Sequence, residues 1–356
     1  MITTFHNKRI TGMLAVFPET LYDYDEETAD FATPKTRRLK KVMGFGSRRA
    51  AKATTTNADF CEYALQQLID DNLIDIKDVG AIIVTRVCPD HFIPHNSNII
   101  HGKFGFSEDV YCVDIPQGCC GFMMGFFQAC MLLDHMPGKK ALVFATDILN
   151  RKDPKTKLTA ASFGGDACTL TVVENDPDAS DIYFSIYNDG ANREALIRHA
   201  GAYRMPSSPE TAIPVDMGHG DGEKKPYDAL WMNGSMVFNF VQKEVPIMFD
   251  KLSEYSGISK DEIEAFFFHQ PNRFMLEKLA DRMGVPREKM PMDIVTKYGN
   301  SSGATVPVAI TTSYGERLLN EKVRCCMSGF GSGLTWTGAI LELGNLDFCK
   351  NVISNL

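Results

Sequence analysis

Residues 115–122 read Ile-Pro-Gln-Gly-Cys-Cys-Gly-Phe, a turn that runs directly into an apolar helical segment. A thiol at a helix start lies at the positive end of the helix dipole, which lowers its pKa and stabilises the nucleophilic thiolate. Two distant segments offer partners for Cys119: Phe-His-Gln-Pro-Asn contains His269, and Tyr-Gly-Asn-Ser-Ser-Gly contains Asn300. A cysteine with a distant histidine and asparagine suits thioester chemistry, so these three residues are the candidate catalytic set.

The composition is that of an ordinary globular protein. The chain has 356 residues, 44% hydrophobic and 23% charged, enough for two core-bearing units. Its ten cysteines are scattered and include two adjacent pairs, so we interpret them as reduced thiols of a cytoplasmic protein. No apolar core follows Met1, and the longest apolar run, residues 121–133, is shorter than the roughly 20 residues that span a bilayer. We expect neither a signal peptide nor a membrane span.

The charge pattern excludes one class of partner and suggests another. The net charge of −8 argues against broad nucleic-acid binding. Within fifteen positions, however, the chain carries seven basic residues: Lys35, Arg37, Arg38, Lys40, Lys41, Arg48 and Arg49. Such a run is either a solvated face or a docking patch for phosphate or an acidic carrier protein, and the sequence leaves both interpretations open.

The chain contains a faint internal duplication. A Lys-Asp pair precedes an apolar run at 80–85, and a second Lys-Asp pair precedes a similar run at 264–269, each after an amphipathic helical pattern. Short apolar strands that alternate with helices indicate α/β layers. An apolar strand ends in an Asn-Asp-Pro turn near residue 175. We therefore divide the chain into an N-terminal half, 1–175, with the nucleophile, and a C-terminal half, 176–356, with the histidine and asparagine.

Five motifs follow one another along the chain. They are the nucleophile turn at 118–122, Ser-Phe-Gly-Gly-Asp-Ala at 162–167, Phe-His-Gln-Pro-Asn at 268–272, Tyr-Gly-Asn-Ser-Ser-Gly-Ala-Thr-Val-Pro at 298–307 and Gly-Phe-Gly-Ser-Gly-Leu-Thr-Trp at 329–336. In content and order they resemble the β-ketoacyl-acyl-carrier-protein synthase III group of the thiolase-like condensing enzymes. Each motif alone is a modest signal, but all five in the family's order span nearly the whole chain.

The resemblance implies a five-layered αβαβα fold of two similar halves, usually as a homodimer. It implies that Cys119 takes an acyl group from a thioester, and that a carbanion made by decarboxylating a malonyl thioester then attacks the acyl-enzyme. The backbone N–H groups of Cys119 and Ser332 would stabilise the oxyanion, and the side chains of His269 and Asn300 would hold the malonyl carbonyl. Cys120 would be a packing residue. No bound cofactor is implied; the substrates would be acyl-ACP or acyl-CoA together with malonyl-ACP.

The resemblance also implies a tunnel for the pantetheine arm and a docking site for the acyl carrier protein. The tunnel candidates are Asn272, Gly234, Phe238 and Ile93. The docking candidates are Arg37, Arg38, Lys41 and Arg273. His91 and His95 have a metal-like spacing, but Pro94 argues against the helix that such a pair needs, so we expect no metal site.

Several positions depart from the pattern of housekeeping members. The tryptophan that grips coenzyme A is absent, and Val42 stands where an arginine is expected. Phe274 replaces the arginine used for carrier docking, with Arg273 one place earlier, and Ser332 replaces a glycine. These changes favour a specialised enzyme of secondary metabolism or surface-polysaccharide synthesis. The alternative is a related acyltransferase that passes the acyl group to an alcohol or amine without decarboxylation.

Overall fold

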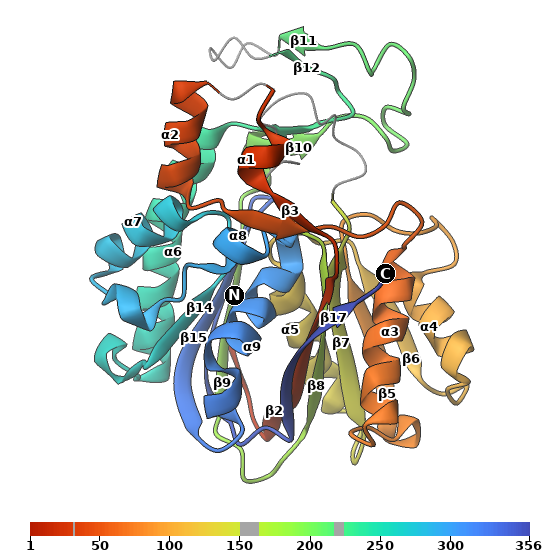
Figure 1. Ribbon diagram of the computed structural model, residues 1–356. Helices are drawn as coiled ribbons and strands as arrows, with labels where there is room; N and C mark the ends of the chain where they lie inside the picture. Colours follow the sequence, from red (N-terminus) through yellow and green to blue (C-terminus); the bar gives the residue numbers. More distant parts are fainter. Residues whose placement is uncertain (31–32, 150–163, 217–223) are drawn as a thin grey trace.

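Two large sheets form the body of the protein. The computed structural model describes residues 1–30, 33–149, 164–216 and 224–356 (Figure 1). Ser162 and Phe163, which begin the second of the five motifs, lie outside the described residues. The order of the six-stranded sheet is β17 (Phe348–Ser354), β2 (Lys8–Pro18), β8 (Ala167–Asn175), β7 (Lys140–Asp147), β5 (Val79–Thr85) and β6 (Tyr111–Ile115). The order of the five-stranded sheet is β1 (Ile2–Phe5), β9 (Ile182–Asn188), β16 (Thr335–Gly344), β15 (Lys322–Gly331) and β14 (Ala265–Phe268).

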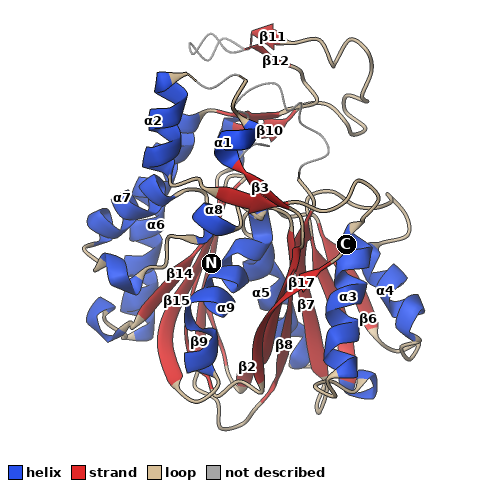
Figure 2. Ribbon diagram, in the orientation of Figure 1, coloured by secondary structure: helices blue, strands red, loops and turns tan. Residues whose placement is uncertain are grey.

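Three helical layers enclose and separate the sheets (Figure 2). Between the sheets lie α5 (Gly121–Leu133) and α9 (Thr305–Leu318), whose residues join inward-facing strand residues in one hydrophobic core. Helices α3 (Asn57–Asp70) and α4 (Asn96–Phe104) cover the outer face of the six-stranded sheet, and α6 (Gly234–Ser256) and α7 (Arg273–Met283) cover the other sheet. The order αβαβα confirms the five-layered fold predicted from the sequence.

The helix sequences match these positions. Helix α5 is apolar nearly all round because sheets pack against it on both sides. Helix α3 buries one face and begins with a capping box, in which Thr56 and Asp59 exchange hydrogen bonds. Helix α6 ends at Gly257, which adopts the left-handed conformation common at helix ends. Within the described ranges, no helix is both long and apolar enough to cross a membrane.

Smaller elements cover the end of the molecule at which the parallel strands finish (Figure 1). They include three short ribbons, β3 (Leu21–Asp23) with β4 (Ser47–Arg49), β10 (Leu196–Arg198) with β13 (Leu230–Met232), and β11 (Val215–Asp216) with β12 (Lys224–Lys225). They also include α1 (Tyr24–Glu27), α2 (Pro34–Met43) and α8 (Ile294–Lys297). Single 3-10 turns lie at η1 (Ile76–Asp78), η3 (Gly190–Ala195), η4 (Lys260–Glu262), η5 (Arg287–Lys289) and η6 (Ser302–Ala304).

Each terminal strand belongs to the sheet that is formed mainly by the other half of the chain. The chain passes from one sheet to the other between the end of β8 at Asn175 and the start of β9 at Ile182. Strand β1 nevertheless pairs with β9, and β17 pairs with β2. The division at residue 175 therefore separates the chain into two segments while each sheet keeps a strand from the other segment; we retain it as a proposal.

Candidate active site

Two of the three candidate catalytic residues follow the carboxyl ends of parallel strands, the edge at which α/β folds commonly bind ligands. Cys119 follows β6 in the turn before α5, and His269 directly follows β14. Asn300 lies in the loop between α8 and η6. The sequence could place each residue at an element's end, but only the packing of the two sheets across α5 and α9 brings the ends together.

Cys119 and Cys120 have different surroundings. Cys120 is fully buried, and its sulfur lies 3.3 Å from the carbonyl oxygen of Thr335. Cys119 is half-buried in front of the turn that follows β15. A methyl group on Gly331 would come within 2.6 Å of the Cys119 Sγ, so only a glycine leaves room for the thiol. This contrast supports Cys119 as the nucleophile and Cys120 as a packing residue.

The electrostatics of the thiol differ from the sequence-based prediction. We expected the helix dipole to lower its pKa. In the structure, burial raises the pKa of Cys119 to about 11, and the charge of Asp147 raises it further. Hydrogen bonds from the backbone N–H groups of Ser332 and Cys119 oppose this rise. The resting nucleophile is therefore a neutral thiol, and the prediction of a lowered pKa was wrong because desolvation outweighs the helix end.

His269 is a buried, neutral imidazole. Its side chain is only 2% exposed, and its ring packs edge-on against Phe330 with the centroids 5.6 Å apart. Burial lowers the pKa of His269 to about 3, although a hydrogen bond to the backbone of Ser302 acts the other way. Nδ1 lies 2.6 Å from Oγ1 of Thr305. At neutral pH the ring therefore carries one hydrogen and can donate through one nitrogen only.

Asn300 is held through its amide oxygen. Oδ1 accepts a hydrogen bond of 2.9 Å from the backbone N–H of Ser302, and the backbone carbonyl of Asn300 accepts the N–H of Gly165 at 3.0 Å. Since the oxygen is engaged within the loop, the amide nitrogen remains for a bound carbonyl. Asn300 is half-buried, so this nitrogen is within reach of a ligand.

Ser302 connects the segments around the site. Its backbone has a positive φ of 53°, a left-handed conformation that side chains rarely adopt. The Ser302 Oγ would lie 3.3 Å from a methyl group on Gly118, which places it beside the nucleophile turn. Its hydroxyl donates a hydrogen bond to Asp147 at the end of β7. Ser302 therefore ties the loop of Asn300 to the turn of Cys119 and to the six-stranded sheet.

Asp147 is a buried carboxyl group close to the thiol. Burial raises the pKa of Asp147 to about 7, while hydrogen bonds from Val87, Ser302 and Cys88 and the charge of Arg86 oppose the rise. The bond from the Val87 N–H measures 2.7 Å. Carboxyl groups whose pKa is raised to near neutrality cluster at functional sites, so we count Asp147 as part of the candidate site.

Sequence reasoning did not single out Ser302, Asp147 or Thr305. Ser302 and Thr305 lie inside the fourth motif, where their hydroxyls carried no assigned role. Asp147 had a local signal, because a carboxylate directly after a wholly apolar strand has to find buried donors. Among the described residues, no three His, Cys, Asp or Glu side chains group as metal ligands.

The tunnel candidates separate into two places. Gly234 begins α6, Asn272 caps α7 by accepting the Met275 N–H at 2.8 Å, and Phe238 stacks on Phe274 at 5.8 Å. These three lie at the N-terminal ends of the adjacent helices α6 and α7. Ile93 is 83% exposed on the loop between β5 and α4, in the other half of the chain. Their role in a tunnel stays a prediction.

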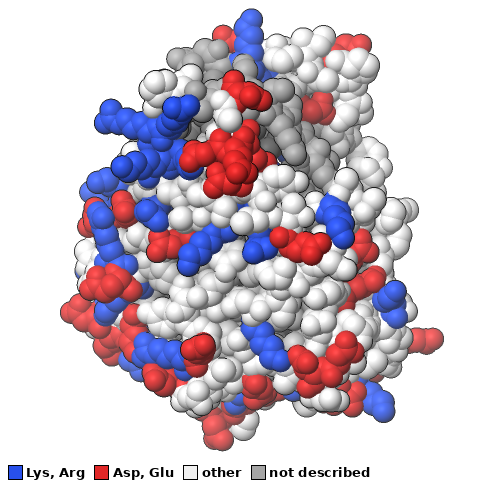
Figure 3. Space-filling view, in the orientation of Figure 1, with Lys and Arg blue, Asp and Glu red and all other residues white. Residues whose placement is uncertain are grey.

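Three docking candidates share the exposed face of α2. Arg37, Arg38 and Lys41 are exposed there and are called the α2 patch below. Figure 3 shows basic side chains gathered over α2, beside an acidic cluster over α1. Arg37, Lys41 and Arg273 line an open hollow of about 430 Å³, and Arg273 is paired with Asp293 at 2.6 Å.

Two residues of the basic run are turned away from this face. Arg48 is buried and paired with Glu27, with Nε 2.7 Å from the carboxylate, and Arg49 bonds the carbonyl of Pro18 at 2.9 Å. The expectation that the run acts as one exposed face was therefore wrong for Arg48 and Arg49. Their strand, β4, inserts them into the structure instead.

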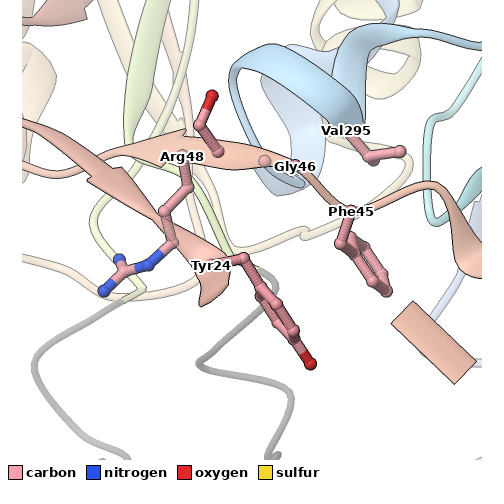
Figure 4. Close-up of a pocket in the computed structure, with 7 residues that line it drawn as sticks. Tyr24, Phe45, Gly46, Arg48 and Val295 are labelled. Atoms are coloured by element: carbon pink, nitrogen blue, oxygen red, sulfur yellow. The ribbon is translucent and has the colours of Figure 1, made fainter. Parts of the chain in front are cut away.

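A small cavity under the same elements is too confined for a substrate (Figure 4). It measures about 10 Å³, no more than a single water needs. Tyr24, Phe45, Val295 and Gly299 are among the residues that line it. Burial raises the pKa of Tyr24 to about 12, with Asp25 adding to the effect. The cavity marks where α1, α2 and α8 meet, next to the loop of Asn300.

Known proteins resemble this chain along its whole length. A family profile described as 3-oxoacyl-(acyl-carrier-protein) synthase III C terminal matches residues 253–343. A putative 3-oxoacyl-(acyl-carrier-protein) synthase 3 of Campylobacter jejuni is 27% identical over 363 residues, covering 99% of this chain and 98% of the relative. The β-ketoacyl-(acyl-carrier-protein) synthase III of Prochlorococcus marinus is 29% identical over 322 residues, covering 90% and 92%. The crystal structure of a 3-oxoacyl-(acyl-carrier-protein) synthase from Burkholderia xenovorans superimposes with a TM-score of 0.90 at 27% identity, covering 99% of each chain.

The fold and the cysteine-centred site define a thiolase-like condensing enzyme. These relatives show that the chain is similar to β-ketoacyl-acyl-carrier-protein synthase III enzymes along nearly its whole length. The resemblance predicted from the five motifs is thus confirmed.

Proposed function

We propose that the protein condenses an acyl thioester with a malonyl thioester, using Cys119 to carry the acyl group. The observation that supports this most directly is the meeting of distant segments. The thiol lies against Gly331, the Ser302 side chain lies beside the turn of Cys119, and Ser302 engages both Asn300 and His269. Decarboxylative condensation needs a nucleophile, an oxyanion site and two neutral donors, and these segments provide all of them.

In the loading step the Cys119 sulfur attacks the thioester carbonyl. A new bond forms between Sγ and the acyl carbon, and the carbon–sulfur bond of the donor breaks. The backbone N–H groups of Cys119 and Ser332, which already bond the thiol sulfur, would stabilise the oxyanion. Losing one such donor typically costs about 2.7–4 kcal/mol in the transition state. Since the resting thiol is neutral, its proton leaves during the attack and passes to the departing thiolate.

In the condensation step the malonyl thioester loses carbon dioxide, and its carbonyl oxygen takes up enolate charge. His269 and the amide nitrogen of Asn300 would donate hydrogen bonds to that oxygen. The enolate carbon then attacks the acyl carbon, the bond between that carbon and the Cys119 sulfur breaks, and the thiolate that leaves takes up a proton from the solvent. Neutral donors suit this step because they bind the enolate oxygen more strongly than the uncharged carbonyl oxygen of the product, which can then leave.

The alternative is transfer of the acyl group to an alcohol or an amine without decarboxylation. It would need a base to take the proton of the incoming alcohol or amine, and an imidazole with a pKa of about 3 is a weak one. It would also leave the placement of Asn300 without a purpose. For this reason we prefer condensation. The departures at Val42, Phe274 and Ser332 support a specialised role in secondary metabolism or surface-polysaccharide synthesis over fatty-acid initiation.

We propose an acyl carrier protein as the donor partner. The α2 patch holds three exposed cations, two of which, Arg37 and Lys41, line an open hollow. Carrier proteins present acidic surfaces to such patches. A coenzyme A donor has less support, because the tryptophan that would stack on adenine is missing. Exposed charge pairs mainly raise the rate of encounter and are screened by salt.

We propose that the protein works as a homodimer. Strand β6 lies at the edge of the six-stranded sheet, directly before the nucleophile turn. Exposed apolar side chains lie near this edge: Tyr111 on β6 itself, and Val87, Phe92 and Ile93 on the loop after β5. An edge strand flanked by apolar residues is a template for pairing with a second copy.

Intact-mass spectrometry tests the proposed reaction. The protein is incubated with acyl-ACP and acyl-CoA donors of several chain lengths, and the added mass identifies the group that loads. Cys119→Ser should abolish loading and Cys120→Ala should retain part of it; an acyl group mapped to Cys120 would refute the assignment. In a second arm, Cys119→Gln should still release carbon dioxide slowly from malonyl-ACP. Loading without any decarboxylation by the wild type, together with ester or amide formation, would establish the transferase instead.

A further inference from the structure

The hydroxyl of Thr305 lies among three polar groups in the buried side of the site. Thr305 begins α9 and is fully buried. Its Oγ1 lies 2.6 Å from Nδ1 of His269, 2.9 Å from the carbonyl oxygen of Ser302 and 3.3 Å from the backbone nitrogen of Gln270. No water can mediate contacts this short, so the position of a single hydroxyl hydrogen determines the pattern.

A count of hydrogens leaves two possible arrangements. The N–H of Gln270 can only donate, and the carbonyl of Ser302 can only accept. In one arrangement the Thr305 hydroxyl donates to Ser302, so Nδ1 of His269 carries the ring hydrogen and donates to Oγ1. In the other, the hydroxyl donates to Nδ1, and the ring hydrogen is on Nε2. In the first arrangement the ring hydrogen can also reach the backbone of Ser302, the contact that opposes the lowering of the His269 pKa, so the Ser302 carbonyl competes for a hydrogen on Nδ1.

In the second arrangement the other donors and acceptors of this cluster stay bonded, and the Nε2–H is left for a bound substrate. The carbonyl of Ser302 also accepts the backbone N–H of Thr305, so it stays bonded when the hydroxyl turns to His269. The shortest of the three contacts is the one to Nδ1. Ser302 itself is fixed on both sides, by Asn300 at its N–H and by Asp147 at its hydroxyl, so its carbonyl does not follow the hydroxyl.

We propose that Thr305 is a positioning residue whose hydroxyl donates to Nδ1 of His269 and thereby makes Nε2 a hydrogen-bond donor toward the substrate carbonyl. This rests on the proposed condensation, in which His269 has to donate. Without the hydroxyl, the ring hydrogen is drawn to Nδ1 by the carbonyl of Ser302, and Nε2 presents a lone pair that repels the enolate oxygen. The nucleophile and the oxyanion site do not use Thr305, so loading of Cys119 does not depend on it.

Three variants test this assignment. Thr305→Val keeps the shape and removes the hydroxyl, whereas Thr305→Ser keeps the hydroxyl. Thr311→Val is the matched control, because Thr311 is a buried threonine of the same helix whose hydroxyl bonds Asn351 and Val308 instead. Each variant is measured for acyl loading, for carbon dioxide release from malonyl-ACP and for folding by circular dichroism.

Nitrogen-15 NMR of protein labelled at histidine provides a readout that does not depend on turnover. The signal of His269 is assigned by its loss in His269→Asn, and its two ring nitrogens show which one carries hydrogen. We expect hydrogen on Nε2 in the wild type and in Thr305→Ser, and on Nδ1 in Thr305→Val. Carbon dioxide release should fall about a hundredfold in Thr305→Val, the typical effect of losing one such donor, with loading and the Thr311→Val control close to wild type.

The outcomes separate this inference from the proposed function. Hydrogen on Nδ1 in the wild type, or no change in Thr305→Val, would overturn the role of Thr305. Equal losses of loading and decarboxylation in Thr305→Val would also overturn it, since they would show general damage to the site. If the wild type releases no carbon dioxide while the NMR result is as expected, the condensation fails and the control of the ring hydrogen by Thr305 stands.

Discussion

Replacing His269 by asparagine should remove a specific sensitivity of the fold to acid. In the folded protein the pKa of His269 is about 3, against an ordinary value of 6.5 in the unfolded chain. Between pH 3 and pH 6.5 the His269 ring is protonated in the unfolded chain but stays neutral in the folded protein. The stability contributed by the neutral ring is therefore complete above about pH 6.5 and is lost as the pH falls toward 3.

The size of the effect follows from the two pKa values. At pH 4.5 the unfolded chain has titrated for two pH units, and each unit corresponds to about 1.36 kcal/mol. The wild type should thus lose about 3 kcal/mol between pH 8 and pH 4.5 through this one group. His269→Asn has no group to titrate there and should not lose it, while other carboxyls and histidines titrate in both proteins and cancel in the difference.

Urea unfolding at equilibrium, followed by circular dichroism and fluorescence at pH 8 and 4.5, measures this difference. We subtract the unfolding free energy of the wild type from that of the variant at each pH. This difference should be about 3 kcal/mol more favourable to the variant at pH 4.5 than at pH 8. NMR titration of the His269 ring serves as the direct control. A gap that does not change with pH, or a ring that titrates near 6.5, would refute the account of a desolvated imidazole.

Three further results are expected. Gly331→Ala should abolish acyl loading without unfolding the protein, because its methyl group would come within 2.6 Å of the Cys119 sulfur and displace it, whereas Gly102→Ala, with open space around it on an exposed helix, should load normally and be up to about 1 kcal/mol more stable. Acyl-ACP should load faster than the matching acyl-CoA, and reversing the α2 patch to glutamate or raising the salt concentration should shrink the advantage; equal loading, unaffected by either change, would show that the patch is only a solvated face. Arg86→Gln should destabilise the protein by about 3–5 kcal/mol, measured by urea unfolding, because it removes the charged partner of the buried Asp114 carboxylate at 3.0 Å and leaves it the backbone N–H groups of Asn96 and Ser97.

Local patterns in the sequence determined the family and the identity of the candidate nucleophile. The turn before α5, the histidine after an apolar strand and the glycine-rich loops are features of adjacent residues, and backbone conformation at a turn or strand end depends mainly on neighbours. The alternation of short apolar strands with helices likewise predicted the layered fold, because burial on both faces requires that pattern.

The tertiary structure decided what depends on groups far apart in the chain. The pKa of Cys119 is raised because strands and loops from both halves remove water from its sulfur, and no local pattern measures that desolvation. Arg48 does not lie on the exposed basic surface, because β4 directs its side chain toward Glu27. Thr305 faces His269, 36 residues away, only because α9 packs beside β14. The sequence thus specified which residue types occur at each strand end, while the meeting of the two sheets set their protonation and their partners.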